Sequence, residues 1–154
     1  MCGIAGYVSL TENDKYLGLL TNAVKSLSKR GPDAQQVKQL SANVAFGHAR
    51  LSIIDTSHVA NQPMTDASGR YTIIFNGEIF NFRELRERFL KDIPLQSHSD
   101  TEVLLNLFVL YKEKCLEHLN GFFAFAVYDN QTSEVFIARD RYGIKPLLIY
   151  KDNS

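Results

Sequence analysis

The stretch RYTIIFNGEIFN at residues 70–81 limits the folds open to this chain more than any other feature. Its β-branched and aromatic residues favour a strand, and they fall on both faces of the extended backbone. A strand that is apolar on both faces must be covered on both sides. We therefore expect it to lie in a sheet buried between layers. It is expected to end at Asn76-Gly77, a dipeptide typical of tight turns.

Helices are expected in three places. Apolar residues recur at three- and four-residue spacing over 16–29, which predicts an amphipathic helix. A second helix is predicted to start at Asn81, where Glu84 three positions later completes a capping-box pattern. A third is predicted to start at Ser99 or Asp100, either of which is a good cap.

Further strands complete the predicted fold. They are a short strand at 3–9, two short strands bent at Gly47 and His48 within 43–55, an antiparallel hairpin at 122–140 and a strand at 145–152. A turn at 30–35 and a polar loop at 56–69 separate these elements. Buried strands with grouped helices favour an α+β fold in which two stacked, mostly antiparallel sheets lie between helical layers.

Size and charge exclude several classes of protein. The 154 residues suit a single domain spanning 1–154. Seventeen basic and 17 acidic side chains give a net charge of zero, so we expect neither a nucleic acid nor a membrane as partner. No apolar run approaches the ~20 residues of a membrane helix, and the N-terminus lacks a basic signal region. Only two cysteines are present, which favours a cytoplasmic location.

Cys2 is the first candidate for chemistry, because it directly follows Met1. If Met1 is removed, Cys2 carries both a thiol and a free α-amine. In general these two groups titrate within about one pH unit of each other, so the amine can accept the thiol proton. One residue would then supply the nucleophile and the general base. The alternative is that Cys2 is a small hydrophobic residue at the start of a strand.

The other reactive side chains give weaker signals. The four histidines, at positions 48, 58, 98 and 118, lack the spacing of metal ligands, so no metal site is expected. Cys115 ends an apolar helical stripe and is expected in the core. Arg139, Asp140 and Arg141 are interpreted as the charged end of the hairpin, with a role in stability.

Eight motifs occur in order along the chain. They are MCGIAG, RGPD, FGHARLSIID, NQPM, FNGEIFNFRELR, SHSDTEVLL, LNGFFAFAVYD and ARDRYGIKPL. Together they resemble the N-terminal glutaminase domain of glutamine-hydrolysing asparagine synthetases, which are class II glutamine amidotransferases with the N-terminal-nucleophile (Ntn) hydrolase fold. The resemblance implies a four-layer α-β-β-α sandwich. It also implies hydrolysis of glutamine to glutamate and ammonia through a cysteinyl thioester.

The resemblance assigns the reacting groups. Cys2 matches the nucleophile, with its own α-amine as the base. Asn76 and Gly77 match the oxyanion hole, where preorganised donors are worth about 3–4 kcal/mol each in such enzymes. The alternative for Asn76-Gly77 is a simple turn. RGPD at 30–33 is expected to shape a loop near the nucleophile, with Arg30 and Asp33 in structural roles.

The resemblance also assigns the residues that bind L-glutamine. Arg50 matches the residue that binds the substrate carboxylate, a role that suits a planar guanidinium, and its alternative is a solvated surface arginine. Asp100 matches the residue that binds the substrate ammonium, and its alternative is a helix cap. Glu78 is expected to orient the substrate, and Leu51 and Ile53 to contact it through main chain.

Relatives of this kind continue into a synthetase domain in cis, which uses ATP and Mg²⁺ to convert aspartate to asparagine. No phosphate-binding signature of that domain occurs in these 154 residues, so no cofactor is expected here. The end of the chain shortly after a predicted strand suggests a C-terminally truncated piece of a larger protein. Another ammonia acceptor and a non-catalytic remnant remain as alternative functions. The oligomeric state is open between a monomer and a homodimer.

Overall fold

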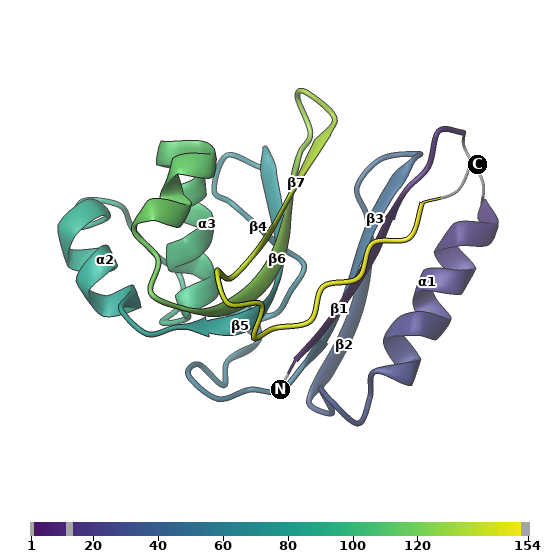
Figure 1. Cartoon of the computed structure of the whole chain (residues 1–154), viewed down its shortest axis with the longest axis horizontal. Helices are drawn as coiled ribbons and strands as arrows, with labels where there is room; N and C mark the ends of the chain where they lie inside the picture. Colours follow the sequence, from purple (N-terminus) through teal and green to yellow (C-terminus); the bar gives the residue numbers. More distant parts are fainter. Residues whose placement is uncertain (1, 12–13, 152–154) are drawn as a thin grey trace.

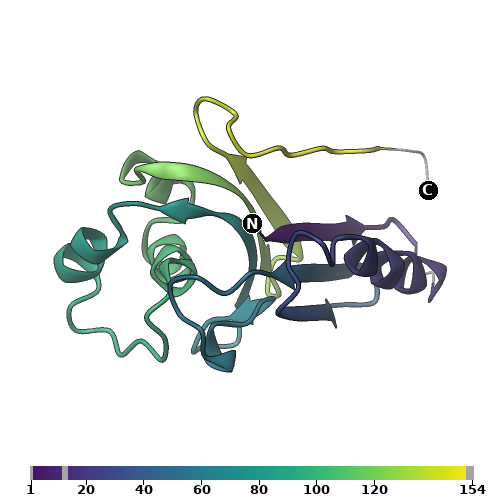
Figure 2. The same ribbon diagram turned by 90° about the horizontal axis from the view of Figure 1, so that it is seen from below.

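The computed structural model describes residues 2–11 and 14–151, and these are arranged in four layers (Figure 1). Helix α1 (Asp14–Ser26) covers the outer face of one sheet. Helices α2 (Phe82–Phe89) and α3 (Asp100–Tyr111) cover the outer face of the other. The two sheets face each other between these helices, which Figure 2 shows from below. The predicted α-β-β-α sandwich is confirmed.

The first sheet has three antiparallel strands in the order β1-β3-β2. They are β1 (Gly3–Val8), β2 (Ala34–Gln39) and β3 (Val44–Arg50). The central strand β3 is buried along its whole length. Strand β2 was not predicted, because its sequence AQQVKQ lies at an edge and carries little apolar signal.

The second sheet has four antiparallel strands in the order β4-β5-β6-β7. They are β4 (Met64–Thr65), β5 (Tyr71–Ile79), β6 (Gly121–Asp129) and β7 (Glu134–Arg139). Strands β6 and β7 form the predicted hairpin. Two 3-10 helices, η1 (His58–Ala60) and η2 (Lys112–Glu117), lie in the connections.

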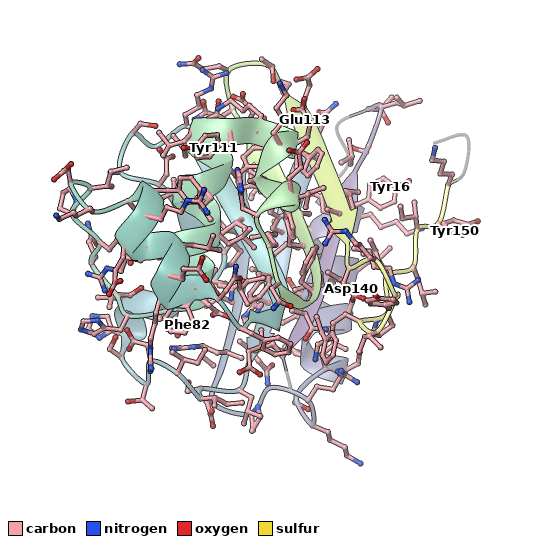
Figure 3. All side chains as sticks on the ribbon, turned by 60° about the vertical axis from the view of Figure 1, so that its left-hand side comes forward. Tyr16, Phe82, Tyr111, Glu113, Asp140 and Tyr150 are labelled. Carbon is pink, nitrogen blue, oxygen red and sulfur yellow. The ribbon has the colours of Figure 1, made fainter. Side chains whose placement is uncertain are left out.

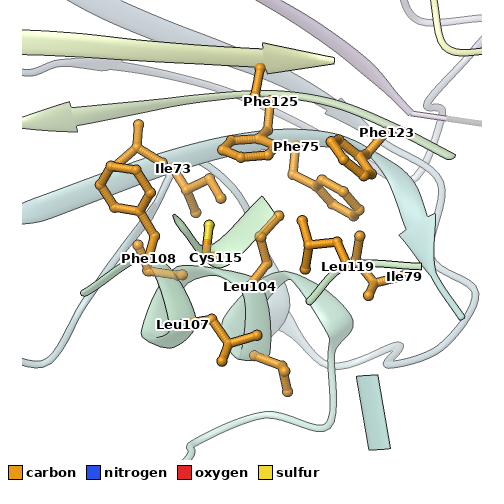
Figure 4. Close-up of a cluster of buried hydrophobic side chains, with 14 of the residues drawn as sticks. Ile73, Phe75, Ile79, Leu104, Leu107, Phe108, Cys115, Leu119, Phe123 and Phe125 are labelled. Atoms are coloured by element: carbon orange, nitrogen blue, oxygen red, sulfur yellow. The ribbon is translucent and has the colours of Figure 1, made fainter. Parts of the chain in front are cut away.

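Three apolar clusters hold these layers together. The largest packs α2 and α3 on the second sheet and contains Phe75, Leu104, Phe125 and the buried Cys115 (Figure 4). A small cluster around Phe46 and Ile74 fills the space between the sheets. A third joins α1 to the first sheet. Burial of Cys115 in the core agrees with the prediction.

Two predicted breaks in strands are wrong. Strand β5 does not end at Asn76-Gly77 but continues to Ile79. A Cβ atom at Gly77 would lie 2.3 Å from the carbonyl oxygen of Phe122, so glycine is needed there for the close approach of β6. Likewise β3 is one continuous strand. At Gly47 a Cβ atom would lie 2.4 Å from Val24, so this glycine makes room for helix α1 and no bend occurs.

The helix caps are partly as predicted. Ser99 caps α3, since its hydroxyl accepts a hydrogen bond from the N–H of Glu102 at 3.2 Å. Asn81 precedes α2 but makes no side-chain cap. Its amide instead donates to the carbonyl of His118 and accepts from the N–H of Asn120, which ties the helix start to the start of β6.

The predicted strand at 145–152 is wrong for the part that the structure describes. Residues 145–151 form no strand, and residue 152 lies outside the described residues. The segment leaves β7 beyond Asp140 and passes on the β1 side of the first sheet (Figures 2 and 3). Leu148 and Tyr150 are 94% and 86% exposed, and among the described residues this apolar sequence pairs with neither of the edge strands β1 and β7. In the described ranges, no helix has the length and apolar character needed to cross a membrane.

Candidate functional site

Cys2 lies beside the end of β3. The register that pairs Gly3 with Ala49 brings the start of the chain next to Leu51. The N–H of Leu51 approaches the Cys2 Sγ at 3.4 Å, and Sγ lies 3.6 Å from the Leu51 carbonyl. Arg30 donates from Nε to the Cys2 carbonyl at 3.4 Å. Cys2 is half-buried, so it is not a fully buried core residue.

The RGPD motif supports this end of β3. A Cβ atom at Gly31 would lie 2.1 Å from the Ala49 carbonyl carbon, so only glycine fits against that backbone. Asp33 accepts from the N–H of Ser52 at 2.7 Å and fixes the chain after Arg50. The predicted structural role of this motif is consistent with these contacts.

Arg50 is buried, with 7% of its surface exposed, so it is not a solvated surface arginine. Its guanidinium donates to the carbonyl of Ser57 at 2.8 Å, to Oδ1 of Asn61 at 2.6 Å and to the carbonyl of Asp55. It thereby organises the loop that follows β3. A guanidinium has five N–H donors, so this set leaves donors for a ligand.

Asp55 extends this loop towards α3. Its carboxylate accepts from the hydroxyl and N–H of Ser57 and from the N–H of His98 at 2.8 Å. The Ser57 hydroxyl and these backbone donors lower the pKa of Asp55 to about 2. The carboxylate is therefore ionised throughout the neutral range, and the loop after β3 stays attached to the turn before α3.

Strand β5 presents its backbone to the site in alternation. The carbonyl of Arg70 and the N–H of Phe80 bond to the β6 side, at Asn130 and Asn120. Even-numbered peptide groups therefore face β6, and odd-numbered ones face the opposite edge. By this alternation the N–H of Gly77 points to the outer edge. Asn76 is 5% exposed as a residue, and its side-chain amide makes no hydrogen bond within the described residues.

Asp100 is the first residue of α3 and is 6% exposed. Its Oδ2 accepts from the N–H of Ile79 at 3.0 Å, which joins α3 to the edge of β5. Since Ser99 is the cap, Asp100 is not needed for that role. Burial raises the pKa of Asp100 to about 6, the backbone bonds oppose this, and the nearby charge of Glu78 adds to it.

All of the residues predicted to bind or react with glutamine line one cavity of about 130 Å³. They are Cys2, Arg50, Leu51, Ile53, Asn76, Gly77, Glu78 and Asp100. They come from the start of β1, the end of β3, the middle of β5 and the start of α3. These predicted residues thus combine a thiol, a guanidinium, two carboxylates and two N–H donor groups, which is a set suited to a zwitterionic amino acid.

The sequence did not identify several residues that line the same cavity. Gln62 precedes β4, Thr101 lies in the first turn of α3, and Lys145 follows β7. Asp140 places Lys145, because its buried carboxylate accepts from the N–H groups of Phe123, Ile144 and Lys145. Gln62 lies in NQPM, one of the motifs on which the family resemblance rests, but this motif did not predict that Gln62 lines the cavity. Histidine, cysteine and carboxylate side chains form no metal-binding group within residues 2–11 and 14–151.

Known proteins that resemble this chain are consistent with the residues that line this cavity. A family profile described as a glutamine amidotransferase domain matches residues 1–154. An asparagine synthetase (glutamine-hydrolysing) of Bacillus subtilis is 41% identical, with 100% of this chain covering 25% of that protein. A probable asparagine synthetase of Acanthamoeba polyphaga mimivirus is 40% identical, with 96% of this chain covering 27% of it.

A solved structure has the same fold. Glutamine phosphoribosylpyrophosphate amidotransferase from B. subtilis matches with a TM-score of 0.69 and 20% identity, over 94% of this chain and 38% of that one. At that identity the likeness supports the fold alone. The chain spans about a quarter of the length of the two synthetase relatives. Because the family profile covers the whole chain, the chain belongs to the glutamine amidotransferase domain family.

Proposed function

We propose that this chain is a glutaminase that hydrolyses the side-chain amide of L-glutamine with Cys2 as the nucleophile. The observation that carries the proposal is the single cavity in which the half-buried Cys2 meets Arg50, Asp100 and the outer edge of β5. A decayed, non-catalytic domain would not be expected to retain a complete set of charges and donors around a thiol.

The chemistry begins with removal of Met1, a step that concerns a residue outside the described ones. The α-amine of Cys2 then takes the proton of its own thiol. The sulfur attacks the side-chain carbonyl carbon of glutamine, and the oxyanion that forms is stabilised by the Asn76 amide and the Gly77 N–H. The protonated amine returns the proton to the leaving nitrogen, and ammonia departs. Water then attacks the thioester and releases glutamate.

The charged ends of glutamine determine where it binds. We assign its α-carboxylate to Arg50. Some N–H donors of this guanidinium bond to the loop, and the remaining ones would bind the carboxylate. We assign its ammonium to Asp100, with Glu78 adding negative charge nearby. We assign main-chain contacts with glutamine to Leu51 and Ile53, which also line the cavity; Ile53 is 73% exposed.

The relatives support a proposal for the destination of the ammonia. The two synthetases named above are glutamine-hydrolysing, and this chain matches only about a quarter of each. We propose that ammonia passes to an ATP-dependent synthetase domain that makes asparagine from aspartate. ATP and Mg²⁺ would act in that domain, and this chain would need no cofactor. This proposal for the acceptor is separate from the glutaminase reaction itself.

Replacing the nucleophile tests the glutaminase proposal. Cys2→Ala removes the only atom that can form the thioester, so glutamate release should fall by about 10³-fold or more. Cys115→Ala removes the buried thiol and should keep turnover at a somewhat lower stability. The intact mass of a sample that is mixed with glutamine and then quenched should reveal an acyl adduct only when Cys2 is present and Met1 is absent. Glutamine turnover by Cys2→Ala would contradict the proposal.

A further inference from the structure

Among the described residues, the outer edge of β5 has no backbone partner where the cavity begins. Strand β4 has only two residues, and it pairs Met64 with Ile73 and Thr65 with Thr72. Beyond Ile73, the odd-numbered peptide groups of β5 face outwards without a neighbouring strand. If the register of β4 continued backwards, Gln62 would lie opposite Phe75, and the residues before it would cover Gly77.

Side chains take the place of the missing strand at this edge. The N–H of Phe75 donates to Oε1 of Gln62 at 2.6 Å, and the carbonyl of Phe75 is bonded to Nε2 of His48 at 3.2 Å. The same residue is therefore held from both sides. A longer β4 would satisfy these groups too, but its chain would occupy the space in front of Gly77.

The chemistry of the bonds fixes the orientation of both side chains. A carbonyl only accepts, so Nε2 of His48 carries the proton, and Nδ1 is left buried without a partner within the described residues. Burial, with a smaller effect of the Arg50 charge, lowers the pKa of His48 to about 4, so the ring is neutral in the physiological range. Gln62 accepts at Oε1 and donates from Nε2 to Thr101 Oγ1 at 3.2 Å.

These contacts are buried and connect three elements. His48 is 1% exposed, Gln62 is 5% exposed and Thr101 is 4% exposed. Together they link β3, the outer edge of β5 and the first turn of α3, where Asp100 bonds to Ile79. The residues that follow the clamped Phe75 are Asn76 and Gly77, whose donors face the cavity.

We propose that Gln62 and His48 are positioning residues for glutamine hydrolysis: by clamping Phe75 they fix where the Asn76 amide and the Gly77 N–H point. The inference rests on the proposed glutaminase function. Donors for an oxyanion help only if they are oriented before the reaction, because reorienting them during the reaction raises the barrier. Side chains in place of a strand hold this part of β5 rigid and leave the cavity open to substrate.

Kinetics of a Gln62→Met variant test the proposal. Methionine keeps the length of the side chain but removes both hydrogen bonds. We expect kcat for glutamine to fall by about 10–100-fold, while KM changes less than about threefold, because the oxyanion forms only in the transition state. The amplitude of the acyl-enzyme burst counts active molecules and should be unchanged. Gln36→Met, on the exposed edge strand β2, is the matched control and should leave kcat unchanged.

A pair of His48 variants separates positioning from packing. His48→Leu removes the donor to Phe75, whereas His48→Gln retains an N–H donor. We expect the loss of kcat in His48→Leu to be recovered at least tenfold in His48→Gln. Equal kcat in both variants, or an unchanged kcat per active molecule in Gln62→Met, would overturn the proposal.

Amide hydrogen exchange followed by NMR provides a measurement that needs no turnover. In Gln62→Met the amide of Phe75 should exchange at least tenfold faster than in the wild type, because its hydrogen bond to Gln62 is lost, with the amides of α1 unchanged. Unchanged protection at this amide would overturn the positioning role even if the protein proved inactive on glutamine. A wild-type protein without glutaminase activity but with this exchange pattern would instead contradict the proposed function alone.

Discussion

At the scale of single residues, Asp100 is the carboxylate proposed to bind the substrate ammonium, and its environment changes its pKa. It is almost fully buried at the start of α3, and burial raises its pKa to about 6 against the effect of the Ile79 N–H. A bound ammonium would favour the ionised form, so binding of glutamine and ionisation of Asp100 are coupled. The nearby Glu78 charge acts in the opposite direction.

This coupling predicts a pH dependence for glutamine hydrolysis. As pH falls below about 6, Asp100 becomes protonated in the free protein, and kcat/KM should fall by up to tenfold per pH unit. Asp100→Asn should raise KM about 10–100-fold, because a charge-assisted bond to ammonium is lost, and should remove the inflection near pH 6. Profiles of kcat/KM between pH 5 and 8 for both proteins provide the measurement. An inflection that persisted in Asp100→Asn would assign it to another group.

The raised pKa also has a consequence for stability. The folded protein binds the Asp100 proton more tightly than the unfolded chain does, whose pKa is near 3.8. Between about pH 4 and pH 6 this residue therefore makes the free energy of unfolding decrease as pH rises. Retaining a buried carboxylate against that cost is expected of a residue that has a functional role.

At the scale of elements, the connection between α1 and β2 determines where β3 ends. Gly31 lies against the backbone of Ala49 and Arg50, with no space for a side chain. The N–H of Asp33 donates to the carbonyl of Arg50, and the Asp33 carboxylate accepts from Ser52. These contacts position Arg50 and the Leu51 peptide that touches Cys2.

Adding one methyl group at two glycines tests this connection. Gly31→Ala would place Cβ 2.1 Å from the Ala49 carbonyl carbon, so we expect a loss of about 2–4 kcal/mol in the free energy of unfolding. Glutaminase activity should fall as well, since Arg50 and Leu51 must shift. Gly18→Ala is the control. That glycine lies in α1, where an added Cβ atom would meet nothing within 4 Å, so alanine should stabilise the helix by about 0.5–1 kcal/mol. Thermal unfolding of both variants is the measurement, and a neutral Gly31→Ala would contradict the close packing.

The elements differ in how well the sequence predicts them. Strand β5 and the β6–β7 hairpin were predictable because their β-branched and aromatic residues directly indicate buried strands. Strand β2 is an edge strand of polar residues, and two-residue β4 exists only through its pairing with β5. The segment 145–151 shows the reverse: its apolar residues favour a strand, but in the structure they pair with no sheet edge and are mostly exposed.

The candidate site was predictable to a similar degree. Its lining residues follow from motifs that resemble a known family, and the cavity unites them. The clamp on Phe75 was not predictable, because it depends on where the chain leaves the register of β4. Neither the glutamine at position 62 nor the histidine at position 48 has a spacing that indicates a contact with that strand.

At the scale of the whole molecule, the site is divided between two sheets. Cys2 directly precedes β1 and Arg50 ends β3, both at the first sheet, whereas Asn76 and Gly77 belong to the second. The apolar cluster between the sheets contains five buried residues, whereas the cluster between the second sheet and its helices contains 18. The distance between nucleophile and oxyanion donors therefore depends on the smaller core, and most of the stability on the larger one.

Two truncations of similar cost distinguish these roles. Phe46→Ala in the core between the sheets and Leu107→Ala, a buried residue of α3, should each reduce the free energy of unfolding by about 3–5 kcal/mol. Only Phe46→Ala lets one half of the site move relative to the other, and misplacing reacting groups by about 1 Å can cost 10²-fold in rate. We expect its glutaminase kcat, per folded molecule and below both melting temperatures, to fall at least tenfold further than that of Leu107→Ala. Equal rates would mean that the sheets are held in register by contacts other than this core.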